Sequence, residues 1–162
     1  NLMTARAVVE GPSMQPNFWT GDLVIVNRSV YYFAPPSRGD VVVLHNPRVP
    51  TGDDLIKRVI GLPGETVEIK EGRVYINGIL IEEPYIERFC ENCDDTWTLA
   101  DDQYFVLGDN RPNSYDSSRF GPVSKDLIVG QAWIRYWPLN DFEILNHLNY
   151  DDFRGVPARE TP

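Results

Sequence analysis

The hydrophobic positions of this chain fall in short runs that Gly and Pro residues separate. Most of the runs are rich in Val and Ile and are too short for a typical helix, which favours β-strands. Residues 66–70 alternate between polar and apolar side chains, and Asn77-Gly78 between two runs indicates a tight hairpin. The predicted strands are residues 23–26, 41–44, 55–62, 66–70, 73–76, 79–81, 104–107 and 129–137.

This pattern predicts a mostly β protein: a folded antiparallel β core with a small inserted β lobe and little helix. We assign residues 1–65 and 103–150 to the core and residues 66–102 to the lobe. Residues 151–162 are polar and contain Pro and Gly, so we expect a flexible C-terminal tail.

Only two segments indicate helix. Residues 124–127 (Ser-Lys-Asp-Leu) could form one capped turn. Phe142, Leu145 and Leu148 recur at a spacing of three, which predicts a short helix near the C-terminus.

Length and charge exclude some classes of protein. The chain has 162 residues, a net charge of −9 and a pI near 4.6. A nucleic-acid-binding surface would be basic, so we expect no nucleic acid as a partner. No run approaches the ~18 apolar residues of a membrane span. Because the first residue is Asn1 rather than Met, we expect a preceding segment, and an anchor helix would fit there.

The sequence predicts no metal ion and no cofactor. Cys90 and Cys93 supply only half of a four-ligand zinc site, and His45 and His147 lie far from them in the chain. We expect a structural disulfide or two inert thiols, with metal and redox roles as the alternatives.

Ser13 is a candidate nucleophile because it lies in a stiff turn, residues 11–16 (Gly-Pro-Ser-Met-Gln-Pro). Pro12 fixes its own φ and Pro16 restricts Gln15. A nucleophile that must keep its angle of attack would suit such a turn. The alternative is an ordinary turn serine.

Lys57 is a candidate general base because it lies inside an apolar run, residues 55–60. Neighbouring side chains of a strand face opposite sides, so Lys57 and Arg58 point apart. If Lys57 faces inward with Leu55 and Val59, burial lowers its pKa below the usual ~10.4. The alternative is that Arg58 faces inward, or that both side chains reach water.

A third candidate is the segment 108–123, which is crowded with short polar side chains and turn formers. It could form a hydrogen-bonded ledge that positions a base, or an ordinary surface loop.

Together, these segments resemble the ordered sequence boxes of the bacterial type I signal peptidases, or leader peptidases, which are serine proteases with a Ser-Lys dyad. The resemblance runs from about Val9 to Trp137. The boxes are residues 13–16 (Ser-Met-Gln-Pro), 38–42 (Arg-Gly-Asp-Val-Val), 57–65 (Lys-Arg-Val-Ile-Gly-Leu-Pro-Gly-Glu) and 108–117 (Gly-Asp-Asn-Arg-Pro-Asn-Ser-Tyr-Asp-Ser).

The resemblance implies a role for each matching residue. Ser13 matches the family's nucleophile and Lys57 its general base. Ser114 matches the serine that hydrogen-bonds and orients the lysine, and Asp116 matches the aspartate that supports the site from behind. Met14 matches the methionine near the substrate-binding surface. The family fold also carries a smaller β lobe between the lysine box and the Gly-Asp-Asn box.

Three positions depart from the family pattern. The backbone N–H of Ser13 is one expected oxyanion donor, but Gly11 stands where some members supply a serine hydroxyl, so the second donor is unknown. We expect Gly11 and Met14 to border the substrate. Asn17 replaces a frequent Thr, and Ser118 stands where an Arg is expected, with Arg119 one place later.

The resemblance implies an endopeptidase that removes signal peptides from secreted preproteins after small residues, of the Ala-x-Ala type. It implies a location at the cell membrane, on the extracytoplasmic face. Phe18 and Trp19 could rest on the lipid interface or belong to the core, and Val24 and Val26 are candidate pocket residues.

Three rival functions are considered. A self-cleaving repressor-type Ser-Lys protease would need a DNA-binding or self-cleaved segment, which this acidic chain does not show. A Ser-His-Asp hydrolase would use His45 or His147. A non-catalytic binding module would not need Ser13.

Overall fold

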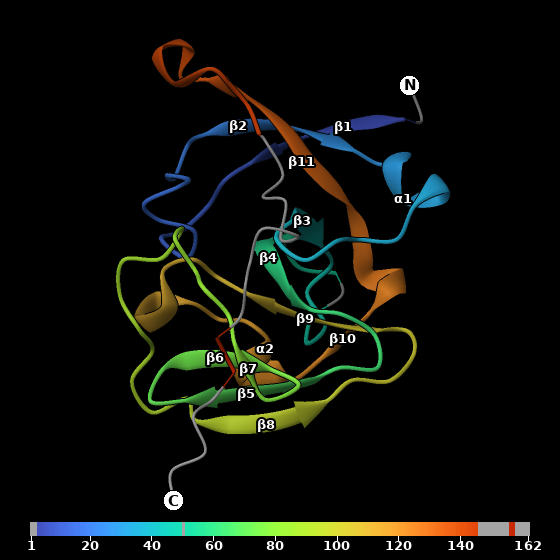
Figure 1. Ribbon diagram of the computed structural model, residues 1–162. Coiled ribbons are helices and arrows are strands. Elements are labelled where there is room, and N and C mark those ends of the chain that lie inside the picture. The colour runs from blue at the N-terminus through green and yellow to red at the C-terminus, as the bar shows by residue number, and fades with distance from the viewer. Residues whose placement is uncertain (1–2, 50, 146–155, 158–162) are drawn as a thin grey trace, which may run out of the picture.

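A computed structural model describes residues 3–49, 51–145 and 156–157, which form two sheets whose strand pairs are antiparallel (Figure 1). The predicted fold class, mostly antiparallel β with little helix, is therefore confirmed. The strands are β1 (Thr4–Val8), β2 (Leu23–Asn27), β3 (Val41–Leu44), β4 (Leu55–Gly61), β5 (Thr66–Lys70), β6 (Arg73–Ile76), β7 (Ile79–Leu80), β8 (Asp95–Thr98), β9 (Gln103–Leu107), β10 (Val123–Ser124), β11 (Ile128–Trp137), β12 (Glu143–Ile144) and β13 (Val156–Pro157).

The larger sheet has the order β1-β2-β11-β3-β4-β9-β10, with β12 paired to β11. The long strand β11 pairs with β2 on one side and β3 on the other, and the register shifts along both pairings. Such irregularities bend a strand and increase its twist. They let one strand join the β1–β2 hairpin to the β3–β4–β9 part of the sheet.

The smaller sheet has the order β13-β7-β6-β5-β8. Four of its strands lie within residues 66–102, the range that the sequence assigns to an inserted lobe. The predicted Asn77-Gly78 hairpin is confirmed: both residues have positive φ, of 50° and 79°, and join β6 to β7. Val156 and Pro157, the two described residues of the predicted tail, pair with β7.

The two sheets share a hydrophobic core. One cluster combines Ile60 and Phe105 of the larger sheet with Val67, Ile69 and other apolar residues of the smaller one. Gly61 lies at the junction, where a Cβ atom would come within 2.5 Å of a Val67 methyl carbon. The lobe is therefore packed tightly against β4, the strand that carries Lys57.

Helices are few and short among the described residues. They are α1 (Val30–Phe33), α2 (Ser117–Phe120) and the 3₁₀ turns η1 (Arg111–Asn113), η2 (Lys125–Leu127) and η3 (Leu139–Asp141). None of them is long or apolar enough to cross a bilayer. The predicted turn at 124–127 is present, and Ser124 caps it.

The predicted C-terminal helix is wrong over its described part. Glu143 and Ile144 form β12, which pairs with β11, and Phe142 only follows the turn η3. Pairing with the open edge of β11 satisfies this backbone without a helix. Leu148 lies outside the described residues.

Candidate active site

Ser13 and Lys57 meet although 44 positions separate them in the sequence: Lys57 Nζ donates a hydrogen bond of 2.9 Å to Ser13 Oγ. Nζ also donates to the carbonyl oxygen of Ile56 at 2.8 Å. Only 3% of Lys57 is exposed. Desolvation by this burial lowers the pKa of Lys57 to about 8, against the opposing effect of the Asp116 and Asp109 charges.

Lys57 and Arg58 are buried on opposite faces of β4, as the period of a strand requires. Arg58 forms a two-pronged ion pair with Asp109, with N···O distances of 2.8 and 2.7 Å, and its guanidinium stacks 4.2 Å from the centre of the Tyr85 ring. Both side chains are buried, so the alternative that both reach water is wrong, and the alternative that Arg58 faces the interior holds for Arg58 without excluding Lys57.

A cavity of about 270 Å³ opens beside Ser13 and Lys57. The strands β1, β2, β3 and β4 supply most of its walls. Its lining residues are Arg6, Ala7, Val8, Val9, Glu10, Ser13, Val24, Val43, Asp53, Asp54, Leu55, Ile56 and Lys57. Both candidate pocket residues, Val24 and Val26, are buried in the core cluster, and Val24 also lines the cavity.

The segment that carries Ser13 is held by two apolar side chains rather than by its turn alone. Met14 and Phe18 are buried in the core cluster of β2, β3 and β11, with 0% and 2% exposure. The Met14 side chain packs beneath the segment and does not line the cavity, and its expected place beside the substrate stays a prediction. Gly11 is exposed but does not line the cavity either.

Ser114 approaches Ser13 through Gly108. A Cβ atom on Gly108 would lie 2.2 Å from Ser114 Oγ and 2.6 Å from the carbonyl oxygen of Ser13, so only glycine fits between them. The hydrogen bond expected from Ser114 to Lys57 is not formed: Ser114 Oγ is buried and has no partner in the described part of the chain. Lys57 bonds Ser13 and its own strand instead.

Asp116, to which the resemblance assigns a supporting role, is buried and contacts the backbone of Gly108 and Ser118. Its carboxylate accepts the N–H of Gly108 at 2.9 Å and caps α2 through the backbone N–H of Ser118. The Ser118 hydroxyl adds a bond of 2.7 Å to the same carboxylate. Ser118 therefore contacts Asp116 from the position where the family pattern expects Arg, while Arg119 is exposed.

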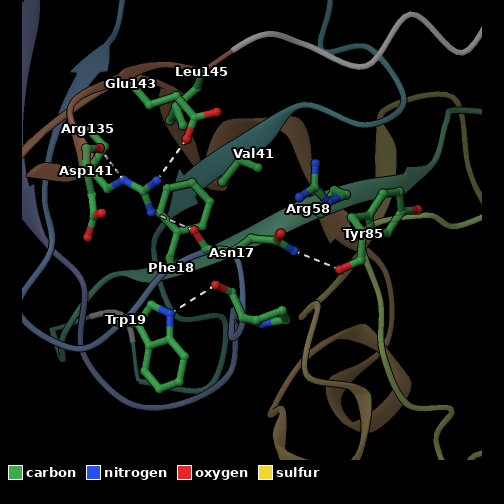
Figure 2. A pocket seen from close by; sticks show the side chains of 11 residues that line it. Asn17, Phe18, Trp19, Val41, Arg58, Tyr85, Arg135, Asp141, Glu143 and Leu145 are labelled. Atoms are coloured by element: carbon green, nitrogen blue, oxygen red, sulfur yellow. Dashed lines mark hydrogen bonds and ion pairs between the residues drawn. The ribbon is translucent and has the colours of Figure 1, made fainter.

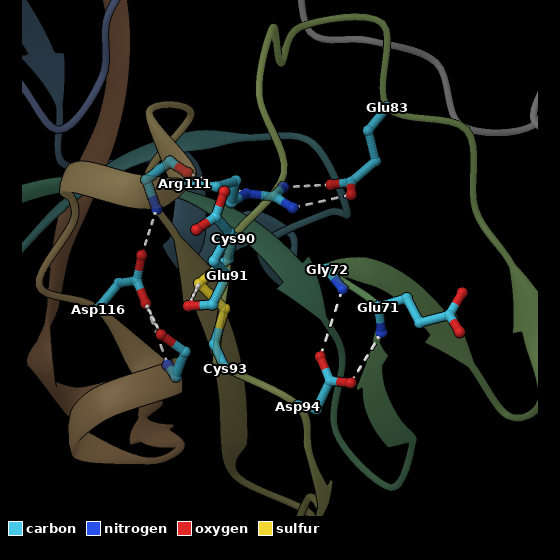
Figure 3. Close-up of a disulfide and its surroundings, with 11 residues drawn as sticks. Glu71, Gly72, Glu83, Cys90, Glu91, Cys93, Asp94, Arg111 and Asp116 are labelled. Atoms are coloured by element: carbon cyan, nitrogen blue, oxygen red, sulfur yellow. Dashed lines mark hydrogen bonds and ion pairs between the residues drawn. A yellow bond between two sulfur atoms is a disulfide. The ribbon is translucent and has the colours of Figure 1, made fainter.

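The sequence reading missed an ion pair between the two parts of the chain. Arg111 of the Gly-Asp-Asn box pairs with Glu83 of the lobe, and both side chains are nearly inaccessible to water (Figure 3). Arg111 Nε also donates to the Gly108 carbonyl at 3.0 Å, and the Tyr85 hydroxyl donates to Glu83. A single Glu in an acidic segment gives no sequence signal of this role.

Asn17 links the segment that carries Ser13 to the lobe from the other side. Its amide nitrogen donates to the Tyr85 carbonyl at 2.7 Å and to Asp109 at 2.8 Å. Figure 2 shows it at the edge of a second cavity, of about 420 Å³, whose other wall carries Arg135 of β11. Arg135 donates to the Asn17 carbonyl and pairs with Glu143.

The remaining candidates lie elsewhere. Cys90 and Cys93 form a disulfide in the lobe, beside the turn at Gly72 (Figure 3). His45 pairs with Asp54 at the surface, at 2.7 Å, and His147 lies outside the described residues. Within residues 3–49, 51–145 and 156–157, no three His, Cys, Asp or Glu side chains are grouped to hold a metal ion.

Comparisons with known proteins agree on one family. The sequence profile of the family described as signal peptidase, peptidase S26, matches residues 1–137. A signal peptidase I of Leptolyngbya laminosa is 43% identical over 143 residues, which cover 82% of this chain and 68% of that protein. Signal peptidase I S of Bacillus subtilis is 39% identical, covering 90% of this chain and 84% of that protein.

A solved structure adds the fold. The crystal structure of a signal peptidase I from Enterococcus faecalis matches 59% of this chain and 95% of that one, with a TM-score of 0.53 and 37% identity.

The buried Glu83–Arg111 pair predicts a large effect of one substitution on stability. In Glu83→Gln the buried Arg111 guanidinium loses its carboxylate partner. We therefore expect the free energy of unfolding to fall by about 3–5 kcal/mol. Urea unfolding measures it. The neighbouring Glu82 is exposed, and Glu82→Gln should stay within about 0.5 kcal/mol of the parent. Equal effects of the two substitutions would contradict the assignment.

Proposed function

This chain belongs to the signal peptidase family, peptidase S26, and from that premise we propose that it is a serine endopeptidase that removes N-terminal signal peptides from secreted preproteins. Ser13 is the nucleophile and Lys57 the general base. The observation that carries the proposal is the hydrogen bond of 2.9 Å between a buried lysine amine and the hydroxyl of the stiff turn.

The chemistry follows from the lowered pKa of Lys57. A pKa of about 8 leaves roughly a tenth of the amine neutral at pH 7. The neutral amine takes the Ser13 proton as Oγ attacks the scissile carbonyl, and then gives that proton to the leaving amine. A water molecule, deprotonated by the same amine, hydrolyses the acyl-enzyme. The N–H of Ser13 donates to the oxyanion.

Ser114 and Asp116 support this dyad in different ways. Ser114 packs on Gly108, which in turn contacts the Ser13 carbonyl. Asp116 holds the N–H of Gly108, and its charge raises the pKa of Lys57 against the effect of burial. Asp116 therefore limits how far burial lowers that pKa and fixes the backbone next to the nucleophile.

The cavity supports a preference for small residues, of the Ala-x-Ala type. Its apolar wall is made by Ala7, Val24, Val43 and Ile56 beside Ser13, and its volume is about 270 Å³. An apolar lining suits small aliphatic side chains, and where a pocket fits closely each extra methylene is worth about 1–3 kcal/mol of discrimination.

We further propose that the protein works at the membrane surface, on the extracytoplasmic side, where it meets secreted preproteins. Of the expected pair, Phe18 is a core residue, while Trp19 is about half exposed. The stronger support is a group of exposed apolar side chains in the segment that runs from the middle of β11 to β12. We call this group the apolar tip. It consists of Trp133, Trp137, Leu139, Phe142 and Ile144. Figure 1 shows this segment projecting beyond the sheet at the top of the view.

Loss of either member of the dyad should abolish cleavage of a purified preprotein with an Ala-x-Ala site. Ser13→Ala removes the attacking oxygen and Lys57→Ala removes the base, so we expect each rate to fall by about 10³-fold or more with the fold retained. His45→Ala is the control and should keep the parent activity. Full activity of Lys57→Ala, or loss of activity in His45→Ala alone, would reject the mechanism.

The pH dependence of cleavage should report the neutral amine. Because the deprotonated form of Lys57 is the active one, kcat/KM should rise with pH through an apparent pKa of about 8. Asp116→Asn removes a charge that raises this pKa, so its limb should move to lower pH even though the activity falls. Asp126→Asn changes an exposed carboxylate and should leave the limb in place. A parent limb near ~10.4, the value of free lysine, would contradict the assignment.

The apolar tip should govern binding to vesicles of phosphatidylcholine. The triple variant Trp137→Ser, Leu139→Ser and Phe142→Ser removes apolar area that would enter the interface, so we expect flotation with vesicles to drop several-fold. Tyr32→Ser with Phe33→Ser changes two exposed aromatic residues on α1 and should bind like the parent. Equal loss in both variants, or no binding by the parent, would overturn the proposal.

A further inference from the structure

Asn110 makes two contacts with the segment that carries the nucleophile. Its backbone N–H donates to the carbonyl oxygen of Ser13 at 2.9 Å, and its side-chain Nδ2 donates to the carbonyl oxygen of Pro12 at 3.0 Å. These contacts bridge 98 positions of sequence. They hold the two peptide groups that flank the Ser13 Cα atom.

The geometry of the peptide bond gives the second contact a consequence for catalysis. The Pro12–Ser13 peptide is trans, since the cis bonds of the described chain are Gln15–Pro16 and Trp137–Pro138. In a planar trans peptide the C=O and the following N–H point in opposite directions. Fixing the direction of the Pro12 carbonyl therefore also fixes the direction of the Ser13 N–H.

Two donors hold the Pro12 carbonyl: Asn110 Nδ2, and the N–H of Gln15, at 3.1 Å, which closes the turn. The Gln15 bond lies within the same short turn and moves with it. Of these two donors, Asn110 is the one that ties this carbonyl to a separate part of the fold, so its side chain helps to fix the direction of this peptide relative to β4 and Lys57.

Asn110 is itself held firmly. The residue before it, Asp109, is paired with Arg58 of β4, and the residue after it, Arg111, is paired with Glu83 of the lobe. All four of these side chains are at most 8% exposed. The amide of Asn110 thus projects from a backbone that buried ion pairs fix on both sides.

We propose that Asn110 is a positioning residue that aims the Ser13 N–H at the developing oxyanion. This deepens the proposed function and rests on it. Gly11 offers no side-chain hydroxyl as a second donor, so the remaining N–H must be oriented well to be effective. Asn suits the position because its amide donates, carries no charge and is short enough to keep the turn close.

Kinetics of preprotein cleavage separate positioning of this donor from a general structural role. An oxyanion contact acts in the transition state, so Asn110→Ala should lower kcat by about 10–100-fold, somewhat less than outright loss of a donor, with KM within about twofold of the parent. Asn110→Asp has the same shape but no donor for the Pro12 carbonyl, and should lose as much. The thermal midpoint of each variant is measured alongside.

A peptide aldehyde that ends in Ala provides the second readout, because its adduct with Ser13 carries a tetrahedral oxygen. Its inhibition constant should rise in Asn110→Ala by about the factor by which kcat falls. Binding of an uncleaved signal peptide to the same variant should not change. Asn140→Ala, which truncates an exposed amide in η3, outside the Gly-Asp-Asn box, should match the parent in both assays.

The outcomes are distinguishable. If the parent cleaves, Ser13→Ala does not, and Asn110→Ala keeps the parent kcat, the inference is wrong while the proposed function stands. A rise in KM equal to the loss of kcat/KM, or equal weakening of aldehyde and peptide, would also overturn it. If the parent fails to cleave, or Ser13→Ala still cleaves, the proposed function falls and the inference with it.

Discussion

The structure depends on the burial of one amine on β4. Taking a lysine out of water costs free energy as long as it stays charged, and the cheaper response is to lose the proton. Lys57 moves in this direction, because burial lowers its pKa to about 8. Its neighbour Arg58 cannot respond in this way, because a guanidinium stays protonated at any pH a protein meets. Arg58 is buried with Asp109 instead. One strand thus holds two buried basic groups, one paired with a carboxylate and one hydrogen-bonded to the Ser13 hydroxyl.

Contacts between the lobe and the residues around Ser13 and Lys57 also explain why the lobe is packed so closely. Glu83 and Tyr85 lie in the same short loop of the lobe, and they reach Arg111, Arg58 and Asn17. These three partners come from the Gly-Asp-Asn box, the lysine strand and the nucleophile segment. Segments that converge from distant parts of a sequence need a common point of attachment, and here the lobe provides it. Its apolar contact at Gly61 adds a second attachment, directly on β4.

Much of this arrangement could be predicted from local patterns. The strands, the Asn77-Gly78 hairpin and the divergence of Lys57 and Arg58 all follow from periods and turn residues that short windows contain. The partners of those residues could not be predicted. The contacts of Arg111 with Glu83 and of Asn17 with Tyr85 join positions 28 and 68 apart, and nothing in either local sequence marks them.

Other features that local sequence does not reveal have the same cause. Met14 follows Ser13 in the chain, but the turn rotates its side chain into the core of β2, β3 and β11. The strand β1 was not predicted although residues 4–8 alternate in burial, because a single short alternation next to the chain start is weak evidence. The spacing near Phe142 predicts a helix, but Glu143 and Ile144 pair with the open edge of β11 instead. Local sequence cannot reveal that partner.

The precision of the site is finally a matter of backbone contacts. At Gly108 the main chain lies against Ser114 and against the carbonyl of Ser13, at distances that no Cβ atom would allow. Its N–H is held by Asp116 and its carbonyl by Arg111, so both polar groups of this one residue are tied to buried, charged side chains. A side chain at this position would push the box away from the nucleophile segment. The distance between Ser13 and Lys57 therefore depends on the absence of a side chain at Gly108 as much as on the side chains of Ser13 and Lys57 themselves.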